Sequence, residues 1–80
     1  MYFVYIAQSQ KDQTLYTGTT TNLEKRLVEH NSGSSRYSST KKPFIYIWYC
    51  YFKNKQQAYD FEKYLKRGSG IAFRNKHLIS

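Results

Sequence analysis

Two phenols, a guanidinium, an imidazole and an isolated carboxylate stand out in this sequence as groups that could do chemistry together. They are Tyr5, Tyr16, Arg26, His30 and Glu62. A phenol or an imidazole can transfer a proton, a guanidinium binds anionic oxygens, and a carboxylate can hold a hard cation. The chain has nine tyrosines and five phenylalanines, however, so aromatic side chains also serve as core material. From the residues alone, both interpretations of the two tyrosines stay open.

The first element that must position these groups is a hairpin. Residues 2–7 and 15–20 are rich in β-branched and aromatic side chains, and the polar residues 8–13 separate them. If the turn is centred between Gln10 and Lys11, Tyr5 lies directly opposite Tyr16 on one face of the sheet. The hairpin therefore predicts that the two phenols are neighbours.

A short helix follows the hairpin. Either of the two polar residues before Leu23 can cap it, and the Asn-Ser-Gly sequence at 31–33 ends it. Leu23 and Leu27 form a narrow apolar stripe. Arg26 and His30 lie together on one flank of that stripe, so we expect both to border the packed face of the helix.

A second helix is predicted over residues 55–67, because Asn54 and Gln57 have the spacing of a capping box. Glu62 projects at the edge of its buried stripe, which consists of Ala58, Phe61 and Leu65. In a chain with only five acidic residues, a carboxylate beside the core needs a partner. That partner is either a basic side chain or a cation from solution, and the sequence does not choose between them.

Between the two helices, the run FIYIWYCYF at residues 44–52 predicts a central strand that is covered on both faces. Ser69 can cap a short last helix, in which Ile71, Phe73 and Leu78 pack. The element order is β-β-α-β-α, followed by a short α. We therefore expect one α/β (α+β) domain over residues 1–80, with helices flanking a three-stranded mixed sheet.

The charge of the chain indicates a polyanionic partner. Thirteen Lys and Arg against five Asp and Glu give a formal net charge of +8, which favours nucleic acid. A basic ribosome-associated or membrane-surface protein is the alternative. The Ser-rich loop at 32–42 carries Arg36, Lys41 and Lys42, and these could meet phosphates together with Lys25, although the loop could equally be a plain connection.

Several other classes of protein are excluded by missing patterns. The sequence has no Gly-rich phosphate loop, no nucleophile elbow around a serine and no cluster of Cys and His with zinc spacing. The single cysteine, Cys50, lies in the most hydrophobic segment and is expected to be a small buried side chain. No stretch approaches the ~20 apolar residues of a membrane span, so we expect a cytoplasmic protein.

The ordered set of motifs resembles the GIY-YIG nuclease superfamily. The matching residues are FVY at 3–5, YTG at 16–18, LEKRLVEHNSG at 23–33 and a lone Glu62 in the following helix. Essentially the whole chain is similar to the small stand-alone bacterial members related to the nuclease domain of the excision-repair endonuclease. In two places the motifs depart from the family pattern. Phe3 and Val4 replace Gly and Ile in the first, and Thr17 replaces the middle Ile of the second.

Two further positions qualify the resemblance. Thr19 stands where several nucleases of the family carry a phosphate-contacting Lys, so any such contact must come from elsewhere, for example from Lys25 or the loop. The family often has a late Asn near the active site, and Asn75 is the one candidate here, with a poor match.

The resemblance implies phosphodiester hydrolysis with one divalent cation, Mg²⁺ or Mn²⁺. Glu62 would hold the cation as a hard oxygen ligand, and Arg26 would bind the scissile phosphate. The general base is Tyr5, Tyr16 or His30, and the phenol pKa, near ~10, must be lowered for a tyrosine to act at neutral pH. His30 could instead orient the phosphate or a tyrosine.

We therefore expect an endonuclease that acts on DNA in preference to RNA, in repair or recombination. Because the core is small, it should be structure-selective or weakly specific, with a protein partner supplying any further specificity. The main alternative is a catalytically inactive nucleic-acid-binding module, in which Glu62 would be tied to a basic residue. A sheet that recognises RNA through the run at 44–52 is disfavoured, because that run is expected to be buried.

Overall fold

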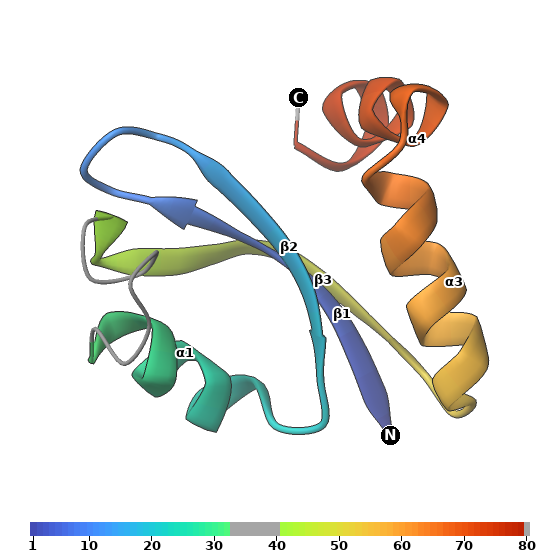
Figure 1. The fold of residues 1–80 in the computed structure, drawn as a ribbon, viewed down its shortest axis with the longest axis horizontal. Coiled ribbons are helices and arrows are strands. Elements are labelled where there is room, and N and C mark those ends of the chain that lie inside the picture. The colour runs from blue at the N-terminus through green and yellow to red at the C-terminus, as the bar shows by residue number, and fades with distance from the viewer. Residues whose placement is uncertain (33–40, 80) are drawn as a thin grey trace.

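A computed structural model describes residues 1–32 and 41–79. The predicted Arg36 and the middle of its loop lie outside the described residues. Within the described residues, the elements along the chain are two strands, a helix, a third strand and a run of helices (Figure 1). Their bounds are β1 Tyr2–Ser9, β2 Leu15–Thr20, α1 Leu23–Asn31, β3 Phe44–Phe52, α3 Lys55–Leu65, α4 Gly68–Phe73 and the π-helical η1 Arg74–Leu78.

The predicted three-stranded sheet with flanking helices is confirmed, but two details of the sheet were wrong. The strand order is β2-β1-β3, and β1 pairs antiparallel with both neighbours, so the sheet is antiparallel and not mixed. In this order β3 is an edge strand, whereas the sequence predicted it at the centre. Because β1 is flanked on both sides, residues Val4 to Ala7 are fully buried, while Tyr49 and Tyr51 of β3 are each 56% exposed.

The hairpin has a different register from the predicted one. Tyr5 faces Gly18, and Tyr16 faces Ala7, so the turn is centred one residue further along the chain than expected. The cause is local to the turn: the Ser9 hydroxyl accepts from the amides of Lys11 and Asp12. Moving the centre of a hairpin by one residue shifts each partner by two, which keeps side chains on their original faces. The two phenols therefore still share a face.

Both predicted helix starts are confirmed by their caps. The Asn22 side chain accepts from the amide of Lys25 at 3.0 Å, and the Asn54 side chain accepts from the amide of Gln57 at 3.1 Å. The predicted cap at Ser69 was wrong, because α4 begins at Gly68 without a side-chain cap. In the described part of the chain, no helix has the length and apolar character to cross a membrane.

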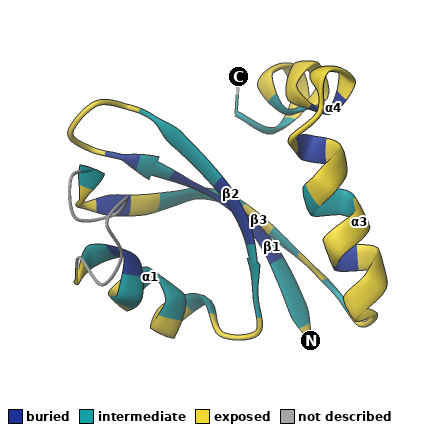
Figure 2. Cartoon of the chain, viewed as in Figure 1, coloured by how far each residue is buried: buried dark blue, intermediate teal, exposed yellow. Residues whose placement is uncertain are grey.

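The sheet separates two hydrophobic clusters, one between the sheet and α1 and the other between the sheet and α3 (Figure 2). On one face Leu23 and Leu27 of α1 pack against Tyr5 and Ala7. On the other face Ala58 and Leu65 of α3 pack against Val4, as the apolar stripe of that helix predicted. Cys50 joins this second cluster, although it is only partly buried. Successive residues of β1 thus serve opposite faces.

Candidate active site

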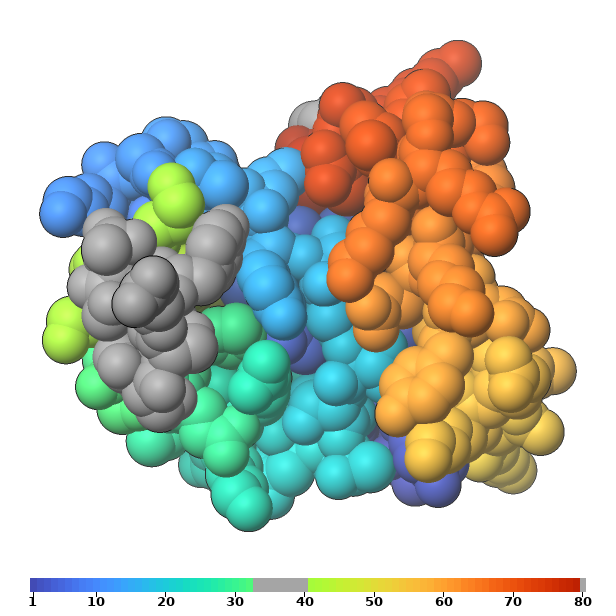
Figure 3. Space-filling view, viewed as in Figure 1, coloured from blue at the N-terminus to red at the C-terminus, as the bar shows by residue number. Residues whose placement is uncertain are grey.

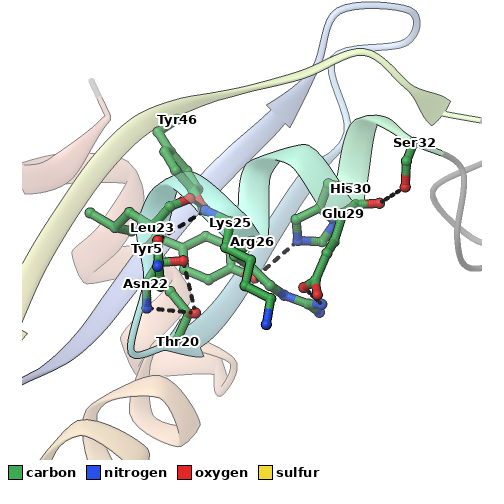
Figure 4. A network of polar contacts seen from close by, with 10 residues as sticks. All are labelled: Tyr5, Thr20, Asn22, Leu23, Lys25, Arg26, Glu29, His30, Ser32 and Tyr46. Atoms are coloured by element: carbon green, nitrogen blue, oxygen red, sulfur yellow. Dashed lines mark hydrogen bonds and ion pairs between the residues drawn. The ribbon is translucent and has the colours of Figure 1, made fainter.

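Tyr5 is the centre of the candidate site. Its side chain is fully buried on the central strand, yet its hydroxyl has two polar partners from α1 (Figure 4). The Nε of Arg26 donates to the Tyr5 hydroxyl at 3.2 Å, and the Nε2 of His30 lies 3.0 Å from the same oxygen. Arg26 and His30 are one helical turn apart, so a single face of α1 presents both. The predicted flank of the helix is the one that meets Tyr5.

The Tyr-x-Gly motif owes its glycine to Tyr5. Gly18 faces Tyr5 across the strands, and a Cβ at Gly18 would lie 2.5 Å from the Tyr5 hydroxyl oxygen and 2.7 Å from its Cζ. Such approaches are closer than packed atoms allow, so any side chain here displaces the ring. The absence of a side chain at Gly18 lets the phenol reach over β2, where it meets Arg26 and His30.

Tyr16 packs beside Tyr5 as a diagonal neighbour. The two rings are stacked with centroids 6.2 Å apart, and the Tyr16 ring is 4.9 Å from that of His30. Tyr46 of β3 closes the opposite side of the Tyr5 ring at 5.0 Å, and its hydroxyl donates to the Leu23 carbonyl of α1. Tyr5 is thus enclosed by aromatic rings, which fixes the position of its hydroxyl.

This enclosure sets the protonation states. Burial raises the pKa of Tyr5 to about 12, although the hydrogen bond from Arg26 lowers it. Burial, together with the charge of Arg26, lowers the pKa of His30 from its ordinary value. At neutral pH the phenol is therefore protonated and the imidazole neutral. A guanidinium only donates, so we assign the Tyr5 hydroxyl as acceptor from Arg26 and donor to Nε2 of His30.

Glu62 approaches the same strand from the other face of the sheet. Its Oε1 accepts from the Thr19 hydroxyl, and its Oε2 pairs with Lys66 Nζ at 2.7 Å. Thr19 faces Val4 across the strands, whereas Gly18 faces Tyr5, so Glu62 and Tyr5 lie on opposite sides of β2. Burial, Arg26 and Tyr16 have larger effects on the pKa of Tyr5, but the Glu62 charge also raises that pKa. The two groups therefore lie within electrostatic range of each other.

The predicted residues therefore converge on the edge strand β2. Figure 3 shows this strand exposed between α1 on one side and α3 on the other. On the α1 side Tyr5 contacts Tyr16, Arg26 and His30, and Glu62 stands on the α3 side. We refer to this arrangement of four residues plus Glu62 as the β2 site.

The residues predicted to bind nucleic acid are more dispersed. Lys25 is exposed next to Arg26 on α1, and Lys42 is exposed before β3. Lys41 instead forms an ion pair with Asp12 at the tip of the hairpin, where Thr14 also contacts it. Asn75 lies in η1 and accepts from Arg74, and none of the described contacts links it to the β2 site.

Two residues that contact the β2 site, Lys66 and Tyr46, were not predicted from the sequence. Lys66 follows Glu62 by four residues, which is the spacing of a helical ion pair and could have identified it. Tyr46, whose pKa is raised to about 12 by burial, belonged to a run that was interpreted only as a strand core. No pattern in the sequence distinguishes Tyr46 from the other aromatic residues of that run.

The chain was compared with known proteins. Residues 1–74 match the model of the GIY-YIG catalytic domain. A UPF0213 protein of Clostridium perfringens is 41% identical over 68 residues, covering 84% of this chain and 72% of the relative. The UPF0213 protein YsiG of Lactococcus lactis is 46% identical over 66 residues, covering 81% of this chain and 62% of the relative.

One solved structure is also similar. It is the solution NMR structure of a UPF0213 protein from Bacillus halodurans, with a TM-score of 0.57 and 28% sequence identity. The match covers 98% of this chain and 87% of that chain. The similarity thus extends over the whole arrangement of strands and helices described above.

Proposed function

This chain belongs to the GIY-YIG nuclease family, and from that premise we propose that it is a divalent-metal-dependent endonuclease that hydrolyses phosphodiester bonds in DNA. The observation that carries the proposal is the hydrogen-bonded chain from Arg26 through Tyr5 to His30, placed across β2 from Glu62. An anion-binding group, a proton-transfer pair and a carboxylate are the parts that hydrolysis of a phosphodiester requires.

Tyr5 and His30 act together as the base. A phenol whose pKa is about 12 does not take a proton from water at neutral pH by itself. If His30 Nε2 accepts the phenol proton while the Tyr5 oxygen takes one from water, tyrosinate never has to accumulate. The low pKa of His30 keeps Nε2 free to accept, and the Arg26 charge stabilises negative charge that develops on the Tyr5 oxygen. This assigns the base to Tyr5 and the supporting role to His30.

Arg26 binds the scissile phosphate. Its side chain is 36% exposed, so the guanidinium still reaches solvent while its Nε is committed to Tyr5. Glu29 pairs with the Nη1 at 3.3 Å and steadies the side chain from the same helix. Tyr16 supports the arrangement by packing on both the Tyr5 and His30 rings.

Glu62 holds the divalent cation. Its carboxylate and the Thr19 hydroxyl beside it are hard oxygen donors of the kind that Mg²⁺ and Mn²⁺ prefer, and the ammonium of Lys66 occupies a cation position against the same carboxylate. The residues therefore fit such an ion. Among the described residues no group of three acidic, His or Cys side chains gathers, so water and substrate oxygens must complete the coordination. When bound, the ion supplies charge stabilisation for the leaving oxygen and the phosphate.

The substrate is expected to bind along β2, with Lys25 and Lys42 adding contacts to its backbone. Lys41 is a weaker candidate than the sequence indicated, because it is held by Asp12. The net charge of +8 supplies attraction without sequence information. We therefore propose recognition of DNA structure, a role in repair or recombination, and specificity supplied by a protein partner.

A specific observation also favours the alternative, a nucleic-acid-binding module without catalysis. In that case Glu62 is tied to a basic residue for structural reasons, and Lys66 is such a residue. Both functions use the basic charge, so they differ in whether Glu62 and a metal ion matter. Glu62 is the residue on which the test must act.

The test is cleavage of single-stranded, nicked, flapped and plasmid DNA with Mg²⁺ or Mn²⁺. We expect cutting by the wild type that is abolished by EDTA and reduced by at least about a hundredfold in Glu62→Gln. Asp60→Asn is the matched control, since this exposed acid lies on the same helix and should leave cutting unchanged. Salt-sensitive DNA binding without cutting, equal in wild type and Glu62→Gln, would instead establish the binding module.

A further inference from the structure

Both oxygens of the Glu62 carboxylate have protein partners from different elements. Thr19 of β2 donates to one oxygen, and Lys66 donates to the other at 2.7 Å. The Glu62 side chain is 20% exposed and that of Lys66 is 52% exposed. Lys66 therefore lies on the solvent side of a carboxylate that β2 holds from within.

This arrangement differs from an ordinary helical ion pair. A Glu and a Lys four residues apart often pair on a helix surface with little consequence. Here Thr19 holds the carboxylate from another element, so its position does not depend on Lys66. The lysine is the one of the two partners that can leave, because its long flexible stem is half-exposed near the end of α3.

A divalent cation and the Lys66 ammonium cannot share this carboxylate closely. Two positive centres within a few ångströms repel each other, and the repulsion is weakly screened beside a part-buried carboxylate. Binding of the ion must therefore move Lys66 outward. The nearest place for the released ammonium is an anionic oxygen of the substrate bound at the same ion. Of the two residues that contact the Glu62 carboxylate, Thr19 is uncharged, whereas Lys66 carries the positive charge that a phosphate needs.

We propose that Lys66 neutralises Glu62 until a divalent cation displaces it, and then binds a backbone phosphate of the DNA beside the cleaved bond. The proposal rests on the proposed function, because it takes Glu62 as the cation ligand. It makes Lys66 a DNA-binding residue whose partner depends on the cation. Removing Lys66 should therefore have opposite effects on cation binding and on DNA binding.

The first experiment measures Mn²⁺ binding to the whole chain without DNA, by water-proton relaxation at about 0.1 M salt. Lys66→Met should bind Mn²⁺ about two- to tenfold more tightly, since a competing charge is gone. Lys66→Arg keeps the charge and can bind a carboxylate through two parallel N–H donors. Its affinity for Mn²⁺ should therefore equal or fall below that of the wild type. Lys63→Met is the matched control, because it removes an exposed lysine from the same helix. It should change affinity less than twofold.

The second experiment measures how DNA affinity depends on salt, in a Tyr5→Phe background that cannot pass on the phenol proton. With Mg²⁺ present, adding Lys66→Met should reduce the slope of log K against log salt by about 0.9, the value for one lost phosphate contact. Without a divalent cation the slope should not change, because Lys66 is then committed to Glu62.

The outcomes separate this proposal from the proposed function. Unchanged or weaker Mn²⁺ binding by Lys66→Met, no Mn²⁺ binding by either protein, or an equal gain in Lys63→Met would each overturn the exchange. A slope that changes equally with and without Mg²⁺ would show a simple phosphate contact instead. If Mn²⁺ binding responds as expected but the wild type never cuts DNA, the exchange stands and the nuclease assignment fails.

Discussion

Replacing Gly18 by alanine tests whether the glycine of the motif exists to admit the Tyr5 ring. The new Cβ would lie 2.5 Å from the Tyr5 hydroxyl, 2.7 Å from its Cζ and 3.0 Å from Cε1 of Tyr16. Tyr5 is fully buried and held by Arg26 and His30, so the ring cannot move aside freely. Overpacking of this kind costs about 1–3 kcal/mol, and displacement of the hydroxyl removes at least one hydrogen bond worth about 1 kcal/mol.

We therefore expect Gly18→Ala to lose about 2–4 kcal/mol of unfolding free energy in urea, without a change in the slope of the transition. DNA cleavage should fall with it, because the phenol no longer meets Arg26 and His30. Gly68→Ala is the matched control, since nothing lies within 4 Å of a Cβ at Gly68. It should be neutral or stabilising by up to about 1 kcal/mol.

A double-mutant cycle isolates the cause. In a Tyr5→Phe background the hydroxyl is absent and the ring is no longer anchored by Arg26, so Gly18→Ala should cost less than in the wild type, by about 1 kcal/mol or more. The reasoning would be refuted if Gly18→Ala cost under about 0.5 kcal/mol, or if it cost the same in both backgrounds.

Three further predictions concern the same cluster. Arg26→Lys should keep the charge but lose the Nε donor to Tyr5. Cleavage, measured by single-turnover kinetics, should therefore fall by about ten- to a hundredfold, while DNA affinity, measured by fluorescence anisotropy, should be nearly unchanged. Activity equal to that of the wild type would contradict the geometry. Because the pKa of Tyr5 is raised to about 12, the stability that Tyr5 confers is complete below about pH 10 and is lost as pH rises toward 12. Urea titrations in that range should show a smaller loss of unfolding free energy in Tyr5→Phe than in the wild type. Because the pKa of His30 is lowered, the protein should lose stability as pH falls below about 6.5, and His30→Gln should flatten this dependence; a NMR titration in which His30 protonates at its ordinary pKa would argue against it.

Elements that rest on local chemistry could be predicted from the sequence. Asn22 and Asn54 cap α1 and α3 as expected, because a cap needs only its own amide neighbours three residues later. That Arg26 and His30 lie on one flank of α1, beside its apolar stripe, also follows locally from the helical period. That Tyr5 and Tyr16 share a face follows from the alternation of strands, which survived an error in the register.

What depended on contacts between distant segments was decided by the tertiary structure. The β3 sequence is as hydrophobic as a central strand, yet β1 occupies the centre of the sheet. Strand order depends on which strand edges pair once the connection through α1 has returned the chain to the sheet. The position of Glu62 is a second case. Its helical face was readable, but its place across β2 from Tyr5 required α3 to cover the opposite side of the sheet.

The sequence by itself determined which side chains could do chemistry and which helix and strand faces would carry them, because helical and strand periods are properties of the backbone alone. Only the tertiary structure decided which of them meet. Gly18 admits Tyr5 to Arg26 and His30, and Thr19 of β2 donates to Glu62 of α3. Those contacts depend on how the two faces of one sheet are covered, which no local pattern records.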